Sequence, residues 1–293
     1  MMDQRKLGSL GDFDQQWREA LTRDARRHLN YPSNEPETQY ELFEHVKATH
    51  LDRLLASREL AGCRVLEYGC GSAGMSVYLA NHGFDTVATD ASLPALRLAE
   101  ENASINLAEE ASEHFSMAAA NAFHLPFGDG QFDIAMSYGL LEHFGPEVLE
   151  PVLVEVLRIL RPGGLFVADI AHGRRSVRTF GIWLSLLASL TLHAATFRWR
   201  RLPELPAAYL DHCYENDLDE QAWVDLLRSA GLISVGARVL HPFPPLALSG
   251  SAERFYVGLM QHASPLVAWF DETQPRWARR WGWLYLTWGA KPK

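Results

Sequence analysis

The chain has 293 residues, of which 47% are hydrophobic and 22% are charged, as is ordinary for a globular protein. Its formal net charge of −9 argues against a nucleic-acid partner, because binding to phosphates requires a basic surface. The three cysteines show neither metal-ligand spacing nor the even number of a disulfide framework, so we expect reduced thiols and no metal site. The first residues carry no apolar segment typical of a signal peptide, which favours a cytoplasmic protein.

Residues 1–60 are expected to form an N-terminal helical cap segment. Residues 12–29 have helical spacing of apolar side chains, and the segment 30–36 breaks that pattern with two prolines. A second helix is expected over residues 37–59. Its apolar stripe includes Tyr40 and Phe43.

The stretch 65–80 reads V-L-E-Y-G-C-G-S-A-G-M-S-V-Y-L-A and predicts a strand, a tight turn and a helix. Its glycines, Gly69, Gly71 and Gly74, allow positive φ and the close approach of a ligand. The start of the helix offers free N–H groups and the positive end of its dipole. The G-x-G-x-x-G spacing alone is unspecific, since it fits a dinucleotide-binding turn and also a turn without catalytic meaning.

Two carboxylates narrow the interpretation of this turn. Glu67 stands two residues before the first glycine, where an anion would repel a pyrophosphate but suit an ammonium or sulfonium charge. Asp90 ends the next apolar stretch, about twenty residues downstream, where a carboxylate can accept both hydroxyls of a ribose.

Alternating strands and helices follow, which is typical of an α/β sheet. Strands are expected near residues 115–119, 132–137, 165–170 and 233–240, and a last one near 283–288. Ser92 and Pro94 are typical of a helix start. A helix over 146–160 is expected to end at the segment Arg161-Pro-Gly-Gly164, whose glycines and proline are typical of a helix C-terminus.

The chain at this point resembles the class I S-adenosylmethionine-dependent methyltransferases, most closely those that act on small molecules. The likeness covers residues 60–170 and continues through Asn121–Phe127, Phe132-Asp133, Leu140–His143 and Arg161–Gly164. It implies a doubly wound, mostly parallel, seven-stranded Rossmann-like sheet whose last strand is antiparallel. It also implies a methyltransferase domain over 61–293 that transfers a methyl group to a small, possibly hydrophobic molecule by in-line displacement.

The resemblance implies S-adenosylmethionine as cofactor, with S-adenosylhomocysteine as product. The cofactor-binding residues that it implies are Glu67, Gly69, Cys70, Gly71, Gly74, Asp90, Ala91, Asn121, Ala122, Phe123, Ser137, Tyr138, His143 and Tyr40. The family usually has aspartate where this chain has Asn121, whose amide oxygen can still accept from an adenine amino group. As general base we consider His143 first, then His172, with Tyr138 and Glu142 behind them.

Residues 171–217 form an insertion, since the family needs only a short link there. Its apolar run from Ile182 to Phe197 would be about 24 Å long as a helix, and arginines flank it. We consider three readings: a cap helix over the substrate site, a helix dipping into a membrane surface with peripheral contact through 174–201, or a dimer interface. We expect the oligomeric state to be either a monomer or a homodimer.

Two other functions remain open at this stage. A nicotinamide-dependent oxidoreductase could use the same glycine turn, although Glu67 speaks against it. A non-catalytic, cofactor-binding or membrane-associated subunit is the second alternative, and the apolar insertion is the feature that favours it.

Overall fold

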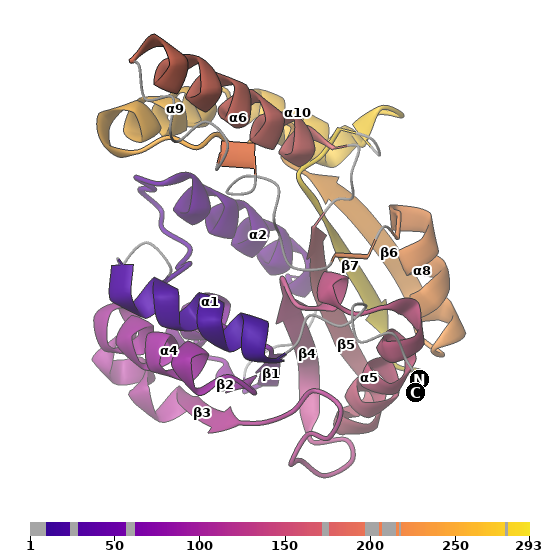
Figure 1. Cartoon of the computed structure of the whole chain (residues 1–293). Coiled ribbons are helices and arrows are strands. Elements are labelled where there is room, and N and C mark those ends of the chain that lie inside the picture. The colour runs from indigo at the N-terminus through magenta and orange to yellow at the C-terminus, as the bar shows by residue number, and fades with distance from the viewer. Residues whose placement is uncertain are drawn as a thin grey trace.

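The structure is a computed structural model of the chain (Figure 1). It describes residues 10–23, 29–56, 62–171, 176–196, 205–206, 215–216, 218–278 and 281–293. Cys213, His172 and the arginines at 174, 175, 198, 200 and 201 lie outside the described residues.

One seven-stranded sheet forms the centre of the molecule, with the strand order β3-β2-β1-β4-β5-β7-β6. Its strands are Arg64–Tyr68 (β1), Asp85–Asp90 (β2), Phe115–Ala119 (β3), Phe132–Tyr138 (β4), Leu160–Ala171 (β5), Ile233–Leu240 (β6) and Leu284–Ala290 (β7). The first five pair in parallel, whereas β7 runs antiparallel to both β5 and β6. The predicted fold class is confirmed, including the antiparallel last strand.

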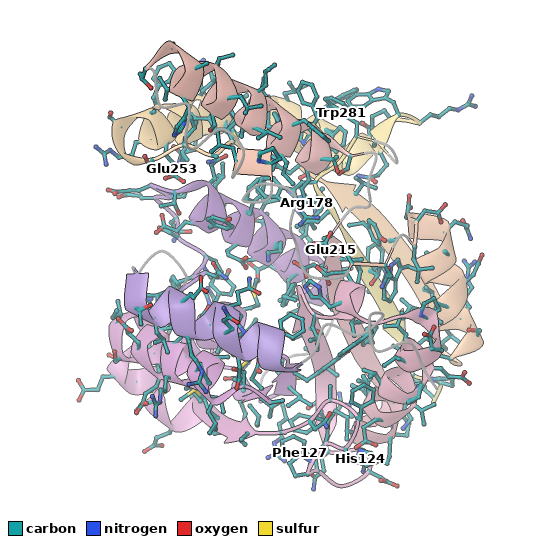
Figure 2. The ribbon with its side chains drawn as sticks, in the orientation of Figure 1. His124, Phe127, Arg178, Glu215, Glu253 and Trp281 are labelled. Atoms are coloured by element: carbon teal, nitrogen blue, oxygen red, sulfur yellow. The ribbon has the colours of Figure 1, made fainter. Side chains whose placement is uncertain are left out.

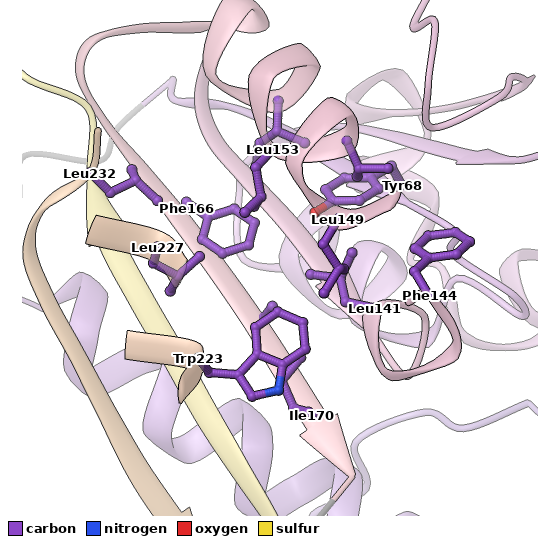
Figure 3. Packing of buried hydrophobic residues seen from close by; sticks show 14 of the residues in the cluster. Tyr68, Leu141, Phe144, Leu149, Leu153, Phe166, Ile170, Trp223, Leu227 and Leu232 are labelled. Carbon is purple, nitrogen blue, oxygen red and sulfur yellow. The ribbon is translucent and has the colours of Figure 1, made fainter. Parts of the chain in front are cut away.

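Helices cover both faces of the sheet, which is why β1 and β4 are apolar on both sides. On one face, Leu51 and Leu79 pack against Ile134 and Val167. On the other face, Leu153 and Trp223 pack around Phe166 (Figure 3). Leu51 belongs to α2 (Gln39–Leu55), Leu79 to α3 (Gly74–Asn81), Leu153 to α5 (Pro146–Ile159) and Trp223 to α8 (Glu220–Ser229). Helix α4 (Leu93–Asn106) and the 3-10 turns η3 (Glu109–His114) and η4 (Leu141–His143) complete the framework.

The expected helix end at 161–164 is wrong. Helix α5 ends at Ile159, and Leu160 is already extended and paired with Phe132 of β4. The register then shifts, so that the next paired residue is Leu165. Gly163 donates its N–H to the carbonyl of Lys291 at 2.9 Å, beyond the end of β7. The proline and glycines thus form an irregularity inside β5 instead of a helix cap.

Two helices precede the sheet, α1 (Leu10–Arg23) and α2 (Gln39–Leu55). Thr38 caps α2 through a capping box with Glu41, which fixes the start of the predicted second helix. Helix α1 lies over α4, and α2 lies between α1 and the upper layer of helices (Figure 1). That upper layer contains α6 (Val177–Ala195), α9 (Gly250–His262) and α10 (Ser264–Thr273).

Candidate active site

The glycine turn joins β1 to α3 at the carboxyl edge of the sheet, as the sequence predicts. Gly71 has a φ of +53°, and a Cβ at this position would lie 2.8 Å from Cζ2 of Trp17. A Cβ at Gly74 would collide with the carbonyl oxygen of Asn30. Glycine is therefore required at both positions, and the segment before α2 packs directly on the turn.

Glu67 lies beneath this turn with its carboxylate at the start of α3. Its Oε2 accepts hydrogen bonds from the Ser76 N–H at 3.0 Å and from the Ser76 hydroxyl at 2.6 Å. The carboxylate thus accepts from a backbone N–H in the first turn of α3, at the positive end of the helix dipole. Burial raises the pKa of Glu67 to about 7, against the lowering effect of the two Ser76 hydrogen bonds. Its charge therefore changes near neutral pH.

Asp90 ties the end of β2 to the glycine turn. Its Oδ2 accepts from the Gly71 N–H at 2.9 Å, and its Oδ1 accepts from the Ser92 N–H at 2.8 Å. Each carboxylate oxygen can accept more than one hydrogen bond, so both remain able to receive ribose hydroxyls. Ala91, the next residue, is exposed beside it. Burial raises the thiol pKa of Cys70, and the negative charges of Glu67 and Asp90 raise it further. This cysteine therefore stays a protonated thiol inside the turn.

The turn after β3 presents the residues predicted to hold adenine. The amide oxygen of Asn121 accepts from the Phe123 N–H at 3.0 Å, and the Asn121 carbonyl accepts from the His124 N–H at 2.9 Å. The Asn121 oxygen thus already orders its own turn, and its second lone pair is the one available to a ligand. Phe123 packs against Phe144 (5.6 Å between ring centroids), with Ala122 beside it on the same core. Their role toward adenine stays a prediction.

Helix α1 closes over this side of the site. Besides Trp17 at Gly71, it places Phe13 edge-on to the ring of His143, with centroids 5.0 Å apart. His143 is therefore half-buried under α1. Of the two α2 aromatics considered from sequence, Tyr40 is 59% exposed, and Phe43 is buried against Trp283 and His241. Phe43 belongs to the core and not to the wall of the cofactor site.

A buried ionic cluster, which sequence reasoning missed, lies at the carboxyl ends of β4 and β5. Lys47 of α2 contacts Glu44 at 2.5 Å and Asp169 of β5 at 2.9 Å. Asp169 also accepts from the Gly139 N–H at 2.5 Å. Burial alone would lower the pKa of Lys47, but the two carboxylates raise it overall, so the ammonium stays charged. We call Glu44, Lys47 and Asp169 the Lys47 cluster.

Tyr138 stands at the exit of β4, next to the buried Ser137, and faces the Lys47 cluster. The Lys47 ammonium lies 5.2 Å from the centre of the Tyr138 ring, a cation–π arrangement. The Tyr138 hydroxyl is buried and has no hydrogen-bond partner among the described residues. Burial raises the pKa of this hydroxyl well above its ordinary value, which Asp169 reinforces. The protonated hydroxyl can therefore donate a hydrogen bond to a bound ligand.

Glu142 provides a second buried carboxyl at this exit. Its Oε1 accepts from the Ala171 N–H at 3.3 Å, while its Oε2 is buried and unpartnered within the described part of the chain. Burial raises the pKa of Glu142 to about 8, and the charges of Asp169 and Glu215 add to the shift. Glu215 itself is paired with Arg178 at the start of α6, at 2.6 and 2.7 Å (Figure 2). A carboxyl with a pKa of about 8 is mostly protonated at neutral pH, and its ionised form, which becomes more populated as pH rises, can accept a proton from an acceptor molecule.

Comparison with known proteins agrees with this geometry. The model of a family described as a methyltransferase domain matches residues 66–168. An uncharacterised methyltransferase of Synechocystis sp. is 35% identical over 111 residues, which are 38% of this chain and 48% of that protein. A demethylmenaquinone methyltransferase of Renibacterium salmoninarum is 30% identical over 151 residues, 51% of this chain and 56% of that protein. These matches span about half the length of each relative.

Residues 66–168 therefore form a domain similar to the S-adenosylmethionine-dependent methyltransferases of class I. Among solved structures, phosphoethanolamine N-methyltransferase 2 of Haemonchus contortus, in complex with S-adenosyl-L-methionine, shares the fold. The TM-score is 0.55 and the identity 16%, and the match covers 94% of this chain and 60% of that one. This likeness agrees with the predicted fold, a mostly parallel seven-stranded sheet whose last strand is antiparallel.

The methyltransferase domain fits the cofactor of its family. Carboxylates stand at the ends of both β1 and β2 beside the glycine turn, where the side chains of Leu140 and Trp17 cover Gly69 and Gly71. Within the described residues, no group of three or more histidine, cysteine or acidic side chains is placed to hold a metal ion. His172, the second base considered from sequence, lies outside the described residues.

Proposed function

We propose that this protein transfers a methyl group from S-adenosylmethionine to a small, apolar molecule. The observation that carries the proposal is the pair of carboxylates around the glycine turn. Asp90 accepts a hydrogen bond from the Gly71 N–H in the turn, and Glu67 accepts one from the Ser76 N–H at the start of α3. A pyrophosphate would need that helix terminus for itself. An anion placed there favours binding of the cationic methionine moiety of S-adenosylmethionine over binding of a nicotinamide dinucleotide.

The sulfonium of the cofactor supplies an activated methyl group, so the task of the protein is mainly to align the acceptor with it. Glu67 would orient the ammonium of the methionine moiety, and Asp90 would bind the ribose. The Tyr138 hydroxyl, held protonated, would donate to the acceptor at the strand exit. The ionic bonds of Lys47 would keep α2 over that exit.

An acceptor with an O–H or N–H group also needs a base. Glu142 now stands ahead of His143 for this role, because its Oε2 is unpartnered within the described residues and its pKa lies near 8. His143 instead packs against Phe13. We expect Glu142→Gln to lower turnover of such an acceptor at least tenfold and to leave S-adenosylhomocysteine binding unchanged. Equal turnover by the Gln variant would remove Glu142 from the mechanism.

The test of the cofactor is calorimetric titration with S-adenosylhomocysteine, with NAD in a parallel experiment. We expect micromolar, selective binding that Asp90→Ala abolishes or weakens at least tenfold. Asp85→Ala is the matched control, because Asp85 begins the same strand and is half-exposed beside Arg64. Binding of NAD, or a wild-type affinity in Asp90→Ala, would contradict the proposal.

Demethylmenaquinone is a suitable first acceptor, since one of the relatives is a demethylmenaquinone methyltransferase. Labelled S-adenosylmethionine would report methyl transfer to it and to other apolar alcohols, phenols and amines. Binding of the cofactor without turnover of any acceptor would favour a non-catalytic subunit.

A further inference from the structure

Helix α6 exposes an uninterrupted apolar stripe. Its exposed residues recur at helical spacing along one side of the helix: Phe180, Trp183, Leu184, Leu187, Ala188, Thr191, Leu192 and Ala195. Trp183 is 54% exposed, Leu187 60% and Leu192 61%. Aspartate, glutamate, lysine and arginine are absent between Thr179 and Ala195, and the one histidine there, the partly buried His193, contacts the Ser189 carbonyl through its ring at 2.9 Å. The outward side of this helix is thus as apolar as a core, over about 22 Å.

The opposite side of α6 is fixed to the protein. Gly181 lies against the backbone of Pro245, where a Cβ would collide with the carbonyl oxygen, and Ser185 Oγ accepts from the Ala247 N–H at 2.9 Å. Val177 and Leu186 are buried on the same side. By length and composition alone α6 could cross a membrane. Because one side packs on residues 245–247, the helix lies along the surface of the molecule instead.

A tryptophan from the C-terminal part extends this stripe. Trp281 is 38% exposed, and its ring lies 5.6 Å from that of Phe180, beside the first turn of α6 (Figure 2). We define the α6 face as Phe180, Trp183, Leu184, Leu187, Leu192 and Trp281. Leucines flanked by tryptophan and phenylalanine are the composition of helices that lie in the interface of a bilayer.

The start of α6 is connected to residues 141–144 of the candidate active site, which include the proposed base Glu142. Arg178 of α6 holds Glu215 in a two-bond ion pair, and the next residue, Asn216, donates its N–H to the Glu142 carbonyl at 2.6 Å. Asn216 also donates its side-chain amide to the carbonyls of Leu141 and Phe144. The helix is therefore attached to the loop that carries the proposed base.

We propose that the α6 face docks on the surface of a lipid bilayer, so that an apolar acceptor reaches the site from the membrane. This inference rests on the proposed function for the identity of the acceptor, but not for the docking itself. Charge points to the mode of binding. The α6 face itself is uncharged and Arg178 is neutralised by Glu215, while five further arginines flank α6 in the sequence within a chain that carries −9 overall. Insertion of the apolar side chains therefore provides the attachment, and anionic headgroups are expected to add to it through the flanking arginines.

The test is co-flotation of the full chain with phosphatidylcholine vesicles, with and without 30% phosphatidylserine. We expect binding to both kinds of vesicle, with less than a twofold change between about 50 and 500 mM salt on pure phosphatidylcholine and a decrease with salt only where phosphatidylserine is present. Leu187→Glu is expected to lower the partition coefficient at least tenfold. Val154→Glu is the matched control, because Val154 is an apolar residue of α5 that is 58% exposed. It is expected to bind like the wild type.

Three outcomes would overturn the docking proposal. The first is a wild type that does not float with vesicles, and the second is a Leu187→Glu variant that binds as well as Val154→Glu. The third is a wild-type dimer in light scattering that Leu187→Glu converts to monomers without any vesicle binding, which would make the face an interface between two copies. Calorimetry with S-adenosylhomocysteine on the same samples separates these results from a failure of the proposed function, because α6 lies in the upper layer of helices, away from β1, which leads into the glycine turn (Figure 1).

Discussion

At the scale of single residues, the ionisation of Glu67 is expected to control cofactor affinity. Its pKa of about 7 means that its negative charge develops as pH rises through neutrality. The ammonium of S-adenosylhomocysteine prefers the ionised form, so affinity should rise about tenfold, or ~1.4 kcal/mol, between pH 5.5 and 7.5. Titration calorimetry at several pH values measures this.

Glu67→Gln is the matched variant for this experiment. Its amide oxygen can still accept from the Ser76 N–H, so α3 keeps its first turn. Affinity in Glu67→Gln should be lower and nearly independent of pH over the same range. A slope equal to that of the wild type would show that another group is responsible.

The positions of Glu67 and Asp90 beside the glycine turn could be predicted from sequence, whereas their role toward a cofactor stays a prediction. Both residues lie at the ends of recognisable apolar strands, and the glycines have a characteristic spacing. The Lys47 cluster could not be predicted in this way, since Lys47 and Asp169 are 122 residues apart. One local signal was present: Asp169 follows the apolar run Phe166-Val-Ala168, just as Asp90 ends its strand.

At the scale of helices and strands, the Lys47 cluster is expected to hold α2 on the sheet. Lys47→Met would leave Glu44 and Asp169 buried without a cation, which typically costs about 3–5 kcal/mol. Chemical denaturation of the purified variant measures the loss. The triple variant Glu44→Gln, Lys47→Met, Asp169→Asn should recover much of it, because it removes the uncompensated charges. A single Lys47→Met variant as stable as the wild type would show that the cluster contributes no such constraint.

The contact of α1 with the glycine turn gives a second prediction at this scale. Gly71→Ala places a Cβ 2.8 Å from Trp17 and in a left-handed conformation, so it should cost about 1–3 kcal/mol of stability. In a Trp17→Ala background only the backbone strain remains, and the cost should fall to about 1 kcal/mol. A double-mutant cycle by denaturation measures this difference. Equal costs in both backgrounds would mean that α1 does not lie on the turn.

The ends of helices and strands could be predicted where the hydrophobic periodicity and the capping residues agreed. Helix α4, for example, begins after Ser92 as expected. They were not predictable at residues 161–164, because proline and glycine are equally typical of a helix end and of an irregular strand. The pairing of Leu160 with Phe132, which is a non-local contact, selects the strand. The surroundings of α6 could not be predicted from sequence for a similar reason. An apolar run indicates that a helix is buried, but it does not indicate whether the protein core, a membrane or a second subunit covers it.

At the scale of the whole molecule, the buried carboxyls are expected to make stability fall as pH rises. Glu67 and Glu142 have pKa values of about 7 and 8 in the folded chain, above the ordinary value of 4.5, and burial also raises the pKa of Glu44. The folded state then binds protons that the unfolded chain has released, so their stabilising effect is complete below about pH 4.5. It is lost as pH rises to about 8.

His241 acts in the opposite direction, but only at lower pH. Burial lowers its pKa from 6.5 to about 3, so the unfolded chain binds the extra proton between these values and stability rises with pH up to about 6.5. Between pH 6.5 and 8 His241 no longer contributes, whereas Glu67 and Glu142 still do. Unfolding of the wild type in this window should therefore become easier with each step in pH. Glu142→Gln should reduce that loss by about 1–2 kcal/mol, since one proton per molecule corresponds to ~1.4 kcal/mol per pH unit. Denaturant titrations of both chains at pH 6.5 and 8 measure the difference, and parallel losses in the two would show that Glu142 is ionised throughout the folded state.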